Sequence, residues 1–215
     1  MAVAVLPRRD EMARAHLDEV AQAARPVVSA TERVLPVPGE LGALVPTLRR
    51  GAVVAVEGEM GAGSTSVGLR LAAAATAAGE WAAAVEQHGS LGGLAAAEAG
   101  VVLERFAVVR RVPPARWAAV VAALLDGVGL VLTEVPRYAR ASDARRLAAR
   151  ARERGAVLVG IGGWPAEAAV RLSAGISAWH GLELGSGVLA ARELRVQVEG
   201  HGVPAHAVVP LSRAG

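Results

Sequence analysis

The sequence predicts an α/β domain with a mostly parallel, twisted sheet, helices on both faces and an antiparallel hairpin at the C-terminal end. Short apolar runs recur after residue 50 and alternate with Ala-rich segments of helical length. Strands that are apolar throughout are typical of parallel sheets, which helices cover on both faces. Near the end, Leu194, Val196 and Val198 alternate with polar residues, which indicates antiparallel strands with one wet face. A chain of 215 residues is long enough for one domain with a substantial core.

Composition narrows the class of protein. Hydrophobic residues make up 53% of the chain but aromatic residues only 3%, so we expect a core of Ala, Val and Leu. Cysteine is absent, which excludes disulfides, thiol chemistry and cysteine-bound zinc. The first apolar run is too short for a signal peptide, and no run has membrane-spanning length. We therefore expect a cytoplasmic protein with no membrane partner, whose net charge of +3 permits an anionic partner without requiring one.

Residues 1–38 are expected to form an N-terminal helix and an extended linker, and residues 39–215 the core domain. Asp10–Ala24 carries apolar residues at three- and four-residue spacing with charges between them. Leu17 and Val20 lie in this stripe and are the candidate partner-binding residues. The stripe either contacts another protein or packs back onto the core, because both arrangements bury the same surface.

The core elements follow from the alternation of apolar runs and helical segments. The expected strands of the parallel sheet are Val53–Val56, Trp81–Glu86, Phe106–Val109, Leu130–Val135 and Ala156–Ile161. The expected helices are Ser64–Ala78, Leu91–Ala99, Pro114–Asp126 and Ser142–Arg154. The expected antiparallel strands are Gly175–Leu184, Glu193–Glu199 and His206–Leu211.

A candidate phosphate-binding loop joins the first core strand to the first core helix. In such a loop the backbone N–H groups and the helix dipole hold anionic oxygens. The full pattern is G-x-x-x-x-G-K-[ST], and here serine occupies the lysine position. All 23 basic residues of the chain are arginine, so a biased loss of lysine would favour arginine over serine. The candidate loop residues are Gly58, Gly61, Gly63, Ser64, Thr65 and Ser66.

Two interpretations of this loop stay open. It binds ATP, ADP or phosphate weakly through backbone amides, or it is a vestigial turn that the fold retains. The missing charge-assisted contact is worth about 1.5–3 kcal/mol, or about one to two decades in affinity.

The helix Ser142–Arg154 is strongly basic. Arg140, Arg145, Arg146 and Arg150 form a possible face for an anionic partner. Such a face contacts a nucleic-acid backbone or an acidic protein, or it is simply the solvated side of a covering helix. Whether the chain contacts DNA directly stays open.

Two further signals are weaker. Trp164 lies in a Gly-Gly-Trp-Pro segment and is either an interface anchor or a lid over the core. The histidines do not show metal-ligand spacing with acidic neighbours, so no metal site is expected.

The order of these segments resembles the ATPase core of the RecA recombinase family, from about Arg33 to Leu211. In that family one strand precedes the phosphate loop, a second carries the catalytic glutamate, and a third supplies the magnesium-associated acid. Antiparallel strands then complete the sheet. The resemblance places Glu134 at the position of that acid, where aspartate is usual, and implies a RecA-like fold.

The same resemblance argues against catalysis. Ser64 cannot replace the lysine that reaches the β- and γ-phosphate oxygens. The catalytic glutamate position corresponds to His88, and Glu86 would serve only if the loop shifted by two residues. The sensor glutamine corresponds to Gly162 or Gly163. We therefore expect no ATPase activity and no bound cofactor.

DNA strand exchange is not expected either. The segments Pro136–Ser142 and Gly162–Arg171 are short where recombinases have two long DNA-holding loops. The remaining core resembles the ImuA proteins, including the ImuA-prime type, and more distantly the SulA cell-division inhibitors. The phosphate-loop shape and the N-terminal helix with its linker favour ImuA over SulA.

The ImuA resemblance implies a non-catalytic accessory or adaptor protein in DNA-damage-induced mutagenic translesion synthesis, part of the SOS response. The implied partner is an ImuB-like homologue of Y-family polymerases, with an error-prone C-family DNA polymerase or RecA recombinase as further partners. Two alternatives stay open: a nucleotide-binding, RecA-like ATPase in DNA repair that uses Glu134 and Glu86, and a SulA-like division inhibitor.

Overall fold

A computed structural model describes residues 34–89, 91–183, 186–200 and 206–211. The chain divides into two units, Met1–Glu32 and Arg33–Gly215, and everything below concerns the second. The predicted helix Asp10–Ala24, with Leu17 and Val20, lies outside the described residues.

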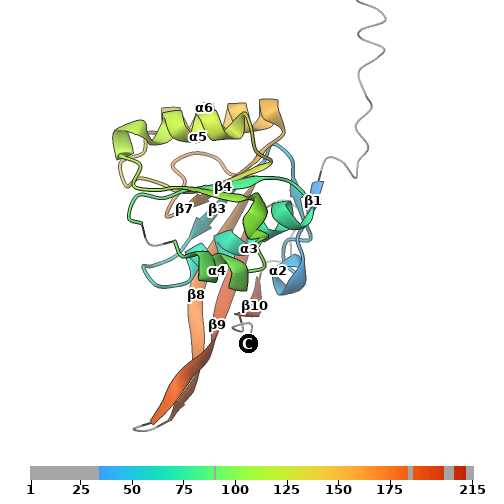
Figure 1. The fold of residues 1–215 in the computed structure, drawn as a ribbon, viewed down its shortest axis with the longest axis vertical. Helices are drawn as coiled ribbons and strands as arrows, with labels where there is room; N and C mark the ends of the chain where they lie inside the picture. The colour runs from blue at the N-terminus through green and yellow to red at the C-terminus, as the bar shows by residue number, and fades with distance from the viewer. Residues whose placement is uncertain (1–33, 90, 184–185, 201–205, 212–215) are drawn as a thin grey trace, which may run out of the picture. The chain divides into compact units, whose positions relative to one another are not determined.

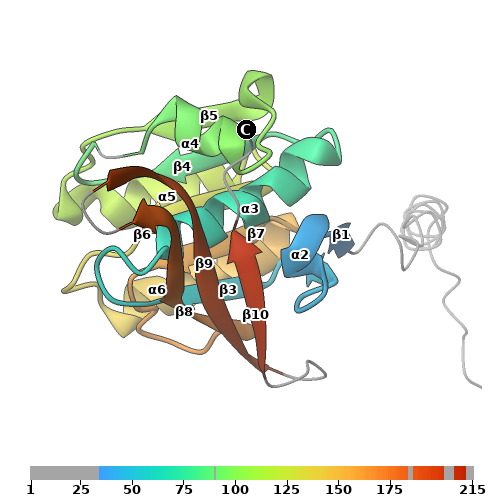
Figure 2. The ribbon, with the colours of Figure 1, turned by 90° about the horizontal axis from the view of Figure 1, so that it is seen from below.

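One sheet of eight strands organises the described residues (Figure 1), in the order β10-β9-β8-β3-β7-β6-β4-β5. The pairs from β8 through β3, β7, β6 and β4 to β5 are parallel, whereas β8, β9 and β10 pair antiparallel. Strand β10 forms one edge, beside β9 (Figure 2). The predicted α/β class, with a mostly parallel sheet and a C-terminal antiparallel hairpin, is confirmed. The strands are β3 (Val53–Glu57), β4 (Ala82–Val85), β5 (Phe106–Val109), β6 (Leu130–Glu134), β7 (Val157–Ile161), β8 (Val170–Glu183), β9 (Ser186–Gly200) and β10 (His206–Leu211).

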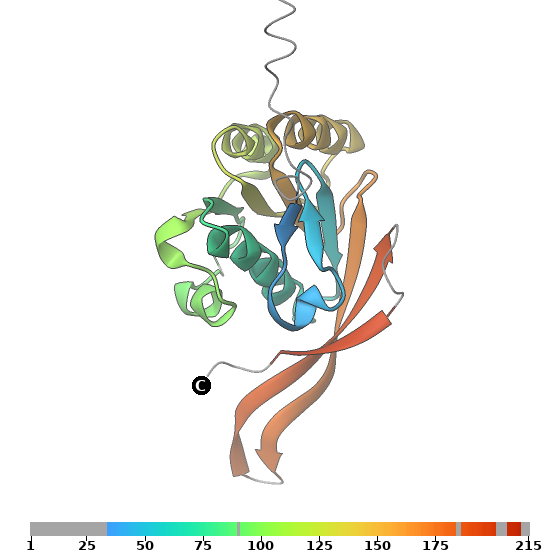
Figure 3. The ribbon, with the colours of Figure 1, turned by 90° about the vertical axis from the view of Figure 1, so that its right-hand side faces the viewer.

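Helices cover both faces of this sheet (Figure 3). Helices α3 (Ser64–Ala77) and α4 (Gly93–Glu98) contribute to one hydrophobic core, with apolar residues of β9. Helices α5 (Trp117–Leu125) and α6 (Ala141–Arg154) contribute to a second core on the opposite face. Short 3₁₀ turns at Leu103–Arg105 and Pro114–Arg116 precede β5 and α5, so the expected helix from Pro114 begins as a 3₁₀ turn.

A small two-stranded sheet precedes the main one. Strand β1 (Val34–Pro36) pairs antiparallel with β2 (Thr47–Arg49), and the short helix α2 (Gly39–Gly42) lies between them. Leu35 is 1% exposed and belongs to the same core as α3. The end of the segment that we predicted as a linker is therefore packed against the core domain.

The start of β8 differs from the prediction. The strand begins at Val170 rather than Gly175, and its first residues pair in parallel with β3, from Val54↔Val170 to Glu57↔Ser173. Beyond these residues β8 pairs only with β9, as a long hairpin that extends past the helices (Figures 1 and 3). Leu172 is fully buried because the strand continues the parallel sheet before it joins the hairpin.

Candidate functional site

The glycine-rich loop runs from the carboxyl end of β3 into the first turn of α3, as predicted. Gly61 and Gly63 have φ angles of 83° and 95°, in the left-handed region that glycine adopts without strain. Within the loop the N–H of Ala62 donates to the carbonyl of Glu59 (3.0 Å), and the N–H of Val67 donates to the carbonyl of Gly63 (3.0 Å). The first N–H groups of a helix lack partners within the helix, so this turn presents donors to an anion.

Ser64, in the lysine position, points into the loop. Its side chain is buried, at 9% exposure, and its Oγ has no hydrogen-bond partner among the described residues. A Cβ built on Gly58 would lie 2.6 Å from this Oγ, which fixes the direction of the hydroxyl. Thr65 is exposed and Ser66 half-buried.

Strand β9 covers one flank of the loop. Leu194 is fully buried, and its side chain packs directly against Gly63. The Arg192 guanidinium donates a hydrogen bond to the Oγ of Ser66. The sequence analysis did not identify Arg192 as a site residue. Its position two residues before Leu194 places it on the same face of β9, which points toward the core.

Glu134, at the end of β6, contacts the residues that follow the neighbouring strand β4. Its Oε2 accepts the backbone N–H of Gln87 (2.8 Å) and lies 3.2 Å from Nδ1 of His88. The two segments meet because β4 and β6 are paired in parallel and therefore end at the same edge. The structure thus brings together Glu134 and His88, the two positions that the resemblance singled out.

Glu86 lies inside the protein rather than in an open site. Its side chain is 1% exposed, and its Oε2 accepts the N–H of Leu91 (2.7 Å). Its Oε1 lies 3.4 Å from Nε of Arg110. The carboxylate therefore fastens the turn that follows β4, which is a structural role.

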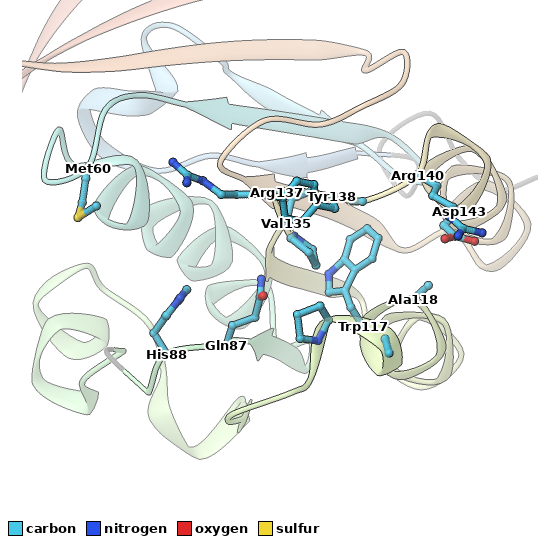
Figure 4. A pocket seen from close by; sticks show the side chains of 14 residues that line it. Met60, Gln87, His88, Trp117, Ala118, Val135, Arg137, Tyr138, Arg140 and Asp143 are labelled. Carbon is cyan, nitrogen blue, oxygen red and sulfur yellow. The ribbon is translucent and has the colours of Figure 1, made fainter.

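A hollow of about 850 Å³ opens beside these residues, at the carboxyl ends of β4 and β6 (Figure 4). Met60 of the phosphate loop and Tyr138, after β6, lie on its rim and are almost completely exposed, at 103% and 94%. Arg137 and Arg140 also line it. The hollow adjoins the loop because Met60 belongs to both.

Buried tryptophans form the base of this region. Trp117 lines the hollow, and its Nε1–H donates to Oγ1 of Thr133 (2.8 Å), which in turn donates to the carbonyl of Glu134 (3.1 Å). Trp164 is 3% exposed and meets Trp117 edge to face, with 6.2 Å between ring centroids. Of the two roles we considered for Trp164, its burial agrees with a lid over the core.

The four predicted arginines have different surroundings. Arg140 lines the hollow (Figure 4), and Arg145 is exposed on α6. Arg146 is exposed and lies 3.9 Å from a carboxylate oxygen of Asp143. Arg150 instead donates from its Nε to Asp126, after α5 (2.8 Å). That hydrogen bond holds the pKa of Asp126 below its ordinary value.

The described part of the chain contains neither a metal-site cluster nor a helix suited to a membrane. Within it, no cluster of three or more His, Asp or Glu side chains has the arrangement of a metal site. No helix there combines the length and the hydropathy needed to cross a bilayer.

A family model matches much of the chain. No curated protein matches the chain. A family model described as "MT3502 N-terminal domain" matches residues 43–166, more than half of the chain, and this region includes the phosphate loop, Glu134 and the hollow. The chain therefore belongs to the family that the MT3502 N-terminal domain defines.

Proposed function

We propose that this protein is a non-catalytic adaptor with a RecA-like fold that acts through protein contacts in DNA-damage-induced mutagenic translesion synthesis. The observation that carries the proposal is the state of the two groups that ATP hydrolysis needs. Ser64 brings no charge to the phosphate loop, and the carboxylate of Glu134 is bonded to Gln87 and close to His88.

The arrangement of the sheet supports a RecA-like core. The loop follows β3, His88 follows β4, and Glu134 ends β6, all at the carboxyl edge of parallel strands. The antiparallel strands β8 to β10 then complete the sheet. This is the order of parts that the resemblance to the recombinase core implies.

The residues present suit a phosphate group better than a magnesium-bound triphosphate. The unpartnered Ser64 hydroxyl and the turn of backbone N–H groups provide donors for phosphate oxygens. A hydrated magnesium ion, in contrast, needs a carboxylate free to accept its waters. Glu86 is buried against Leu91, and Glu134 accepts the Gln87 N–H on one oxygen, which leaves its other oxygen as an acceptor. The missing charge at Ser64 is therefore what argues against hydrolysis. ATP turnover is therefore not part of the proposal.

The hollow provides a surface on which a partner can dock. Tyr138, Met60, Arg137 and Arg140 combine an exposed aromatic ring, a thioether and two guanidinium groups. Aromatic residues, Met and Arg are enriched at protein interfaces. We propose that the ImuB-like homologue of Y-family polymerases binds here, and that an error-prone C-family polymerase or RecA recombinase joins the same assembly in the cytoplasm.

Co-purification tests this proposal. A co-expressed ImuB-like protein is captured on the tagged wild-type chain, on Tyr138→Ala and on Trp81→Ala. Trp81 is a matched control because it is 51% exposed and precedes β4, at the opposite end of the strand from the hollow. We expect wild type and Trp81→Ala to retain the partner and Tyr138→Ala to lose most of it.

Two results would contradict this proposal in different ways. If wild type does not retain the partner, the adaptor role fails. If Tyr138→Ala binds normally but deletion of Met1–Glu32 abolishes capture, the contact belongs to the N-terminal segment and the hollow is not the docking surface.

A further inference from the structure

The phosphate loop contains a buried polar group that no described residue satisfies. The Ser64 Oγ lies beside Gly58, at the first turn of α3, and has no hydrogen-bond partner in the described part of the chain. A buried hydroxyl without a hydrogen bond is costly, so such groups in native proteins usually face a water or a ligand. Ser64 is the first residue of α3, and the first N–H groups of a helix have no partners within the helix. The shape and chemistry of this position therefore suit an acceptor, such as an anionic oxygen.

Strand β9 brings a cation to the same place. Leu194, Val196 and Val198 point into the core that contains α3, and Arg192 is the next residue of this row. The carboxyl end of β3 is level with Gln197 of β9, through the pairs Glu57↔Ser173 and Ser173↔Gln197. Arg192 lies beyond that end, beside the phosphate loop and α3. Arg192 there donates to the Oγ of Ser66, in the first turn of α3.

Two positive charges lie close together beside this turn. Burial lowers the pKa of Arg70, Glu40 raises it, and the positive charge of Arg192 lowers it further. Arg70 lies one helical turn after Ser66, on the same side of α3. Two guanidinium groups thus gather near the amino end of a helix, where the helix dipole favours negative charge. A phosphate group bound at the loop would offset this repulsion.

We infer that the loop of Gly58–Ser66 binds a phosphate group, and that Arg192 supplies from β9 the positive charge that Ser64 does not. Ser64 Oγ and the loop N–H groups hold the phosphate oxygens, and Arg192 turns from Ser66 to the anion. Because the cation is a protein side chain, binding does not require magnesium. The ligand is free phosphate or the terminal phosphate of a nucleoside diphosphate. This inference does not rest on the adaptor role.

Titration calorimetry on the full chain tests the inference. Inorganic phosphate and ADP are titrated separately, each with magnesium and with EDTA, into wild type, Arg192→Gln and Arg195→Gln. Arg195 lies on the same strand but is exposed, so it controls for the loss of one positive charge. We expect wild type to bind at least one ligand equally well in EDTA. Arg192→Gln should weaken binding about tenfold or more, and Arg195→Gln should not.

Each outcome of the titrations either supports or contradicts phosphate binding at the loop. Equal affinity for phosphate and ADP identifies the free anion as ligand, and tighter binding of ADP identifies the nucleotide. The inference fails if wild type binds neither ligand, if binding needs magnesium, or if the two arginine variants behave alike. If Arg192→Gln does not fold, Ser64→Ala takes its place and should show a similar loss. None of these results affects capture of the polymerase homologue, so the two proposals fail separately.

Discussion

Replacing Glu86 distinguishes a structural carboxylate from a catalytic one. The side chain is 1% exposed, accepts the Leu91 N–H at 2.7 Å and lies 3.4 Å from Arg110. A hydrogen bond to a charged group contributes about 1.5–3 kcal/mol, and an unpaired buried N–H costs about 1–3 kcal/mol. These effects overlap, so Glu86→Ala should lower the free energy of unfolding by about 2–4 kcal/mol.

Glu86→Gln keeps an acceptor for Leu91 and loses only the charge facing Arg110. Because Arg110 is 53% exposed, we expect this variant to lose about 1 kcal/mol. In a domain of this size each kcal/mol corresponds to about 2–4 °C in Tm.

Urea denaturation followed by circular dichroism measures these differences, with Glu104→Ala as an exposed control. If Glu86→Ala is as stable as the control, the carboxylate does not fasten the turn after β4, and its assignment here is wrong.

Two further predictions concern stability. Thr133→Val removes the acceptor for the Trp117 Nε1–H at 2.8 Å, and the unpaired buried donor should cost about 1–3 kcal/mol. Trp117→Phe should abolish that penalty in a double-mutant cycle, and additive effects in the cycle would disprove the coupling. Asp126 has a lowered pKa because of its hydrogen bond to Arg150, so its contribution is complete above its ordinary pKa of about 3.9 and is lost as pH falls through the lowered value. Asp126→Asn should therefore be less stable than wild type at neutral pH and equally stable in strong acid, and a pH-independent difference in thermal melts would refute this.

The sequence alone was sufficient to predict the strands and helices that depend on local patterns. We predicted the strands Val53–Val56 and Phe106–Val109 because short apolar runs bounded by turns are typical of buried strands. The start of α3 at Ser64 followed from the spacing of the glycines. The start of β8 at Val170 was missed because Gly and Pro residues before it suggested a loop, and the alternation of Val170 and Leu172 with polar residues is short.

The arrangement of the candidate site was harder to predict, because it depends on tertiary contacts between distant parts of the chain. The loop and Glu134 were found from motif spacing, whereas the contact between Glu134 and His88 requires β4 and β6 to be neighbours. Arg192 is 126 residues from Ser66, and only the register of β9 brings the two together. From the sequence, Arg150 was a candidate contact for an anionic partner. In the structure it donates to Asp126, which lies after α5, and the sequence pattern does not show this contact.

An assay of steady-state ATP hydrolysis tests most directly whether this protein lacks ATPase activity. Purified wild type, Ser64→Lys and Glu134→Ala are assayed with saturating Mg-ATP. We expect wild type to be indistinguishable from Glu134→Ala and from buffer, because Ser64 brings no charge to the phosphate loop. Turnover by wild type that disappears in Glu134→Ala would show a working ATPase and contradict the non-catalytic role.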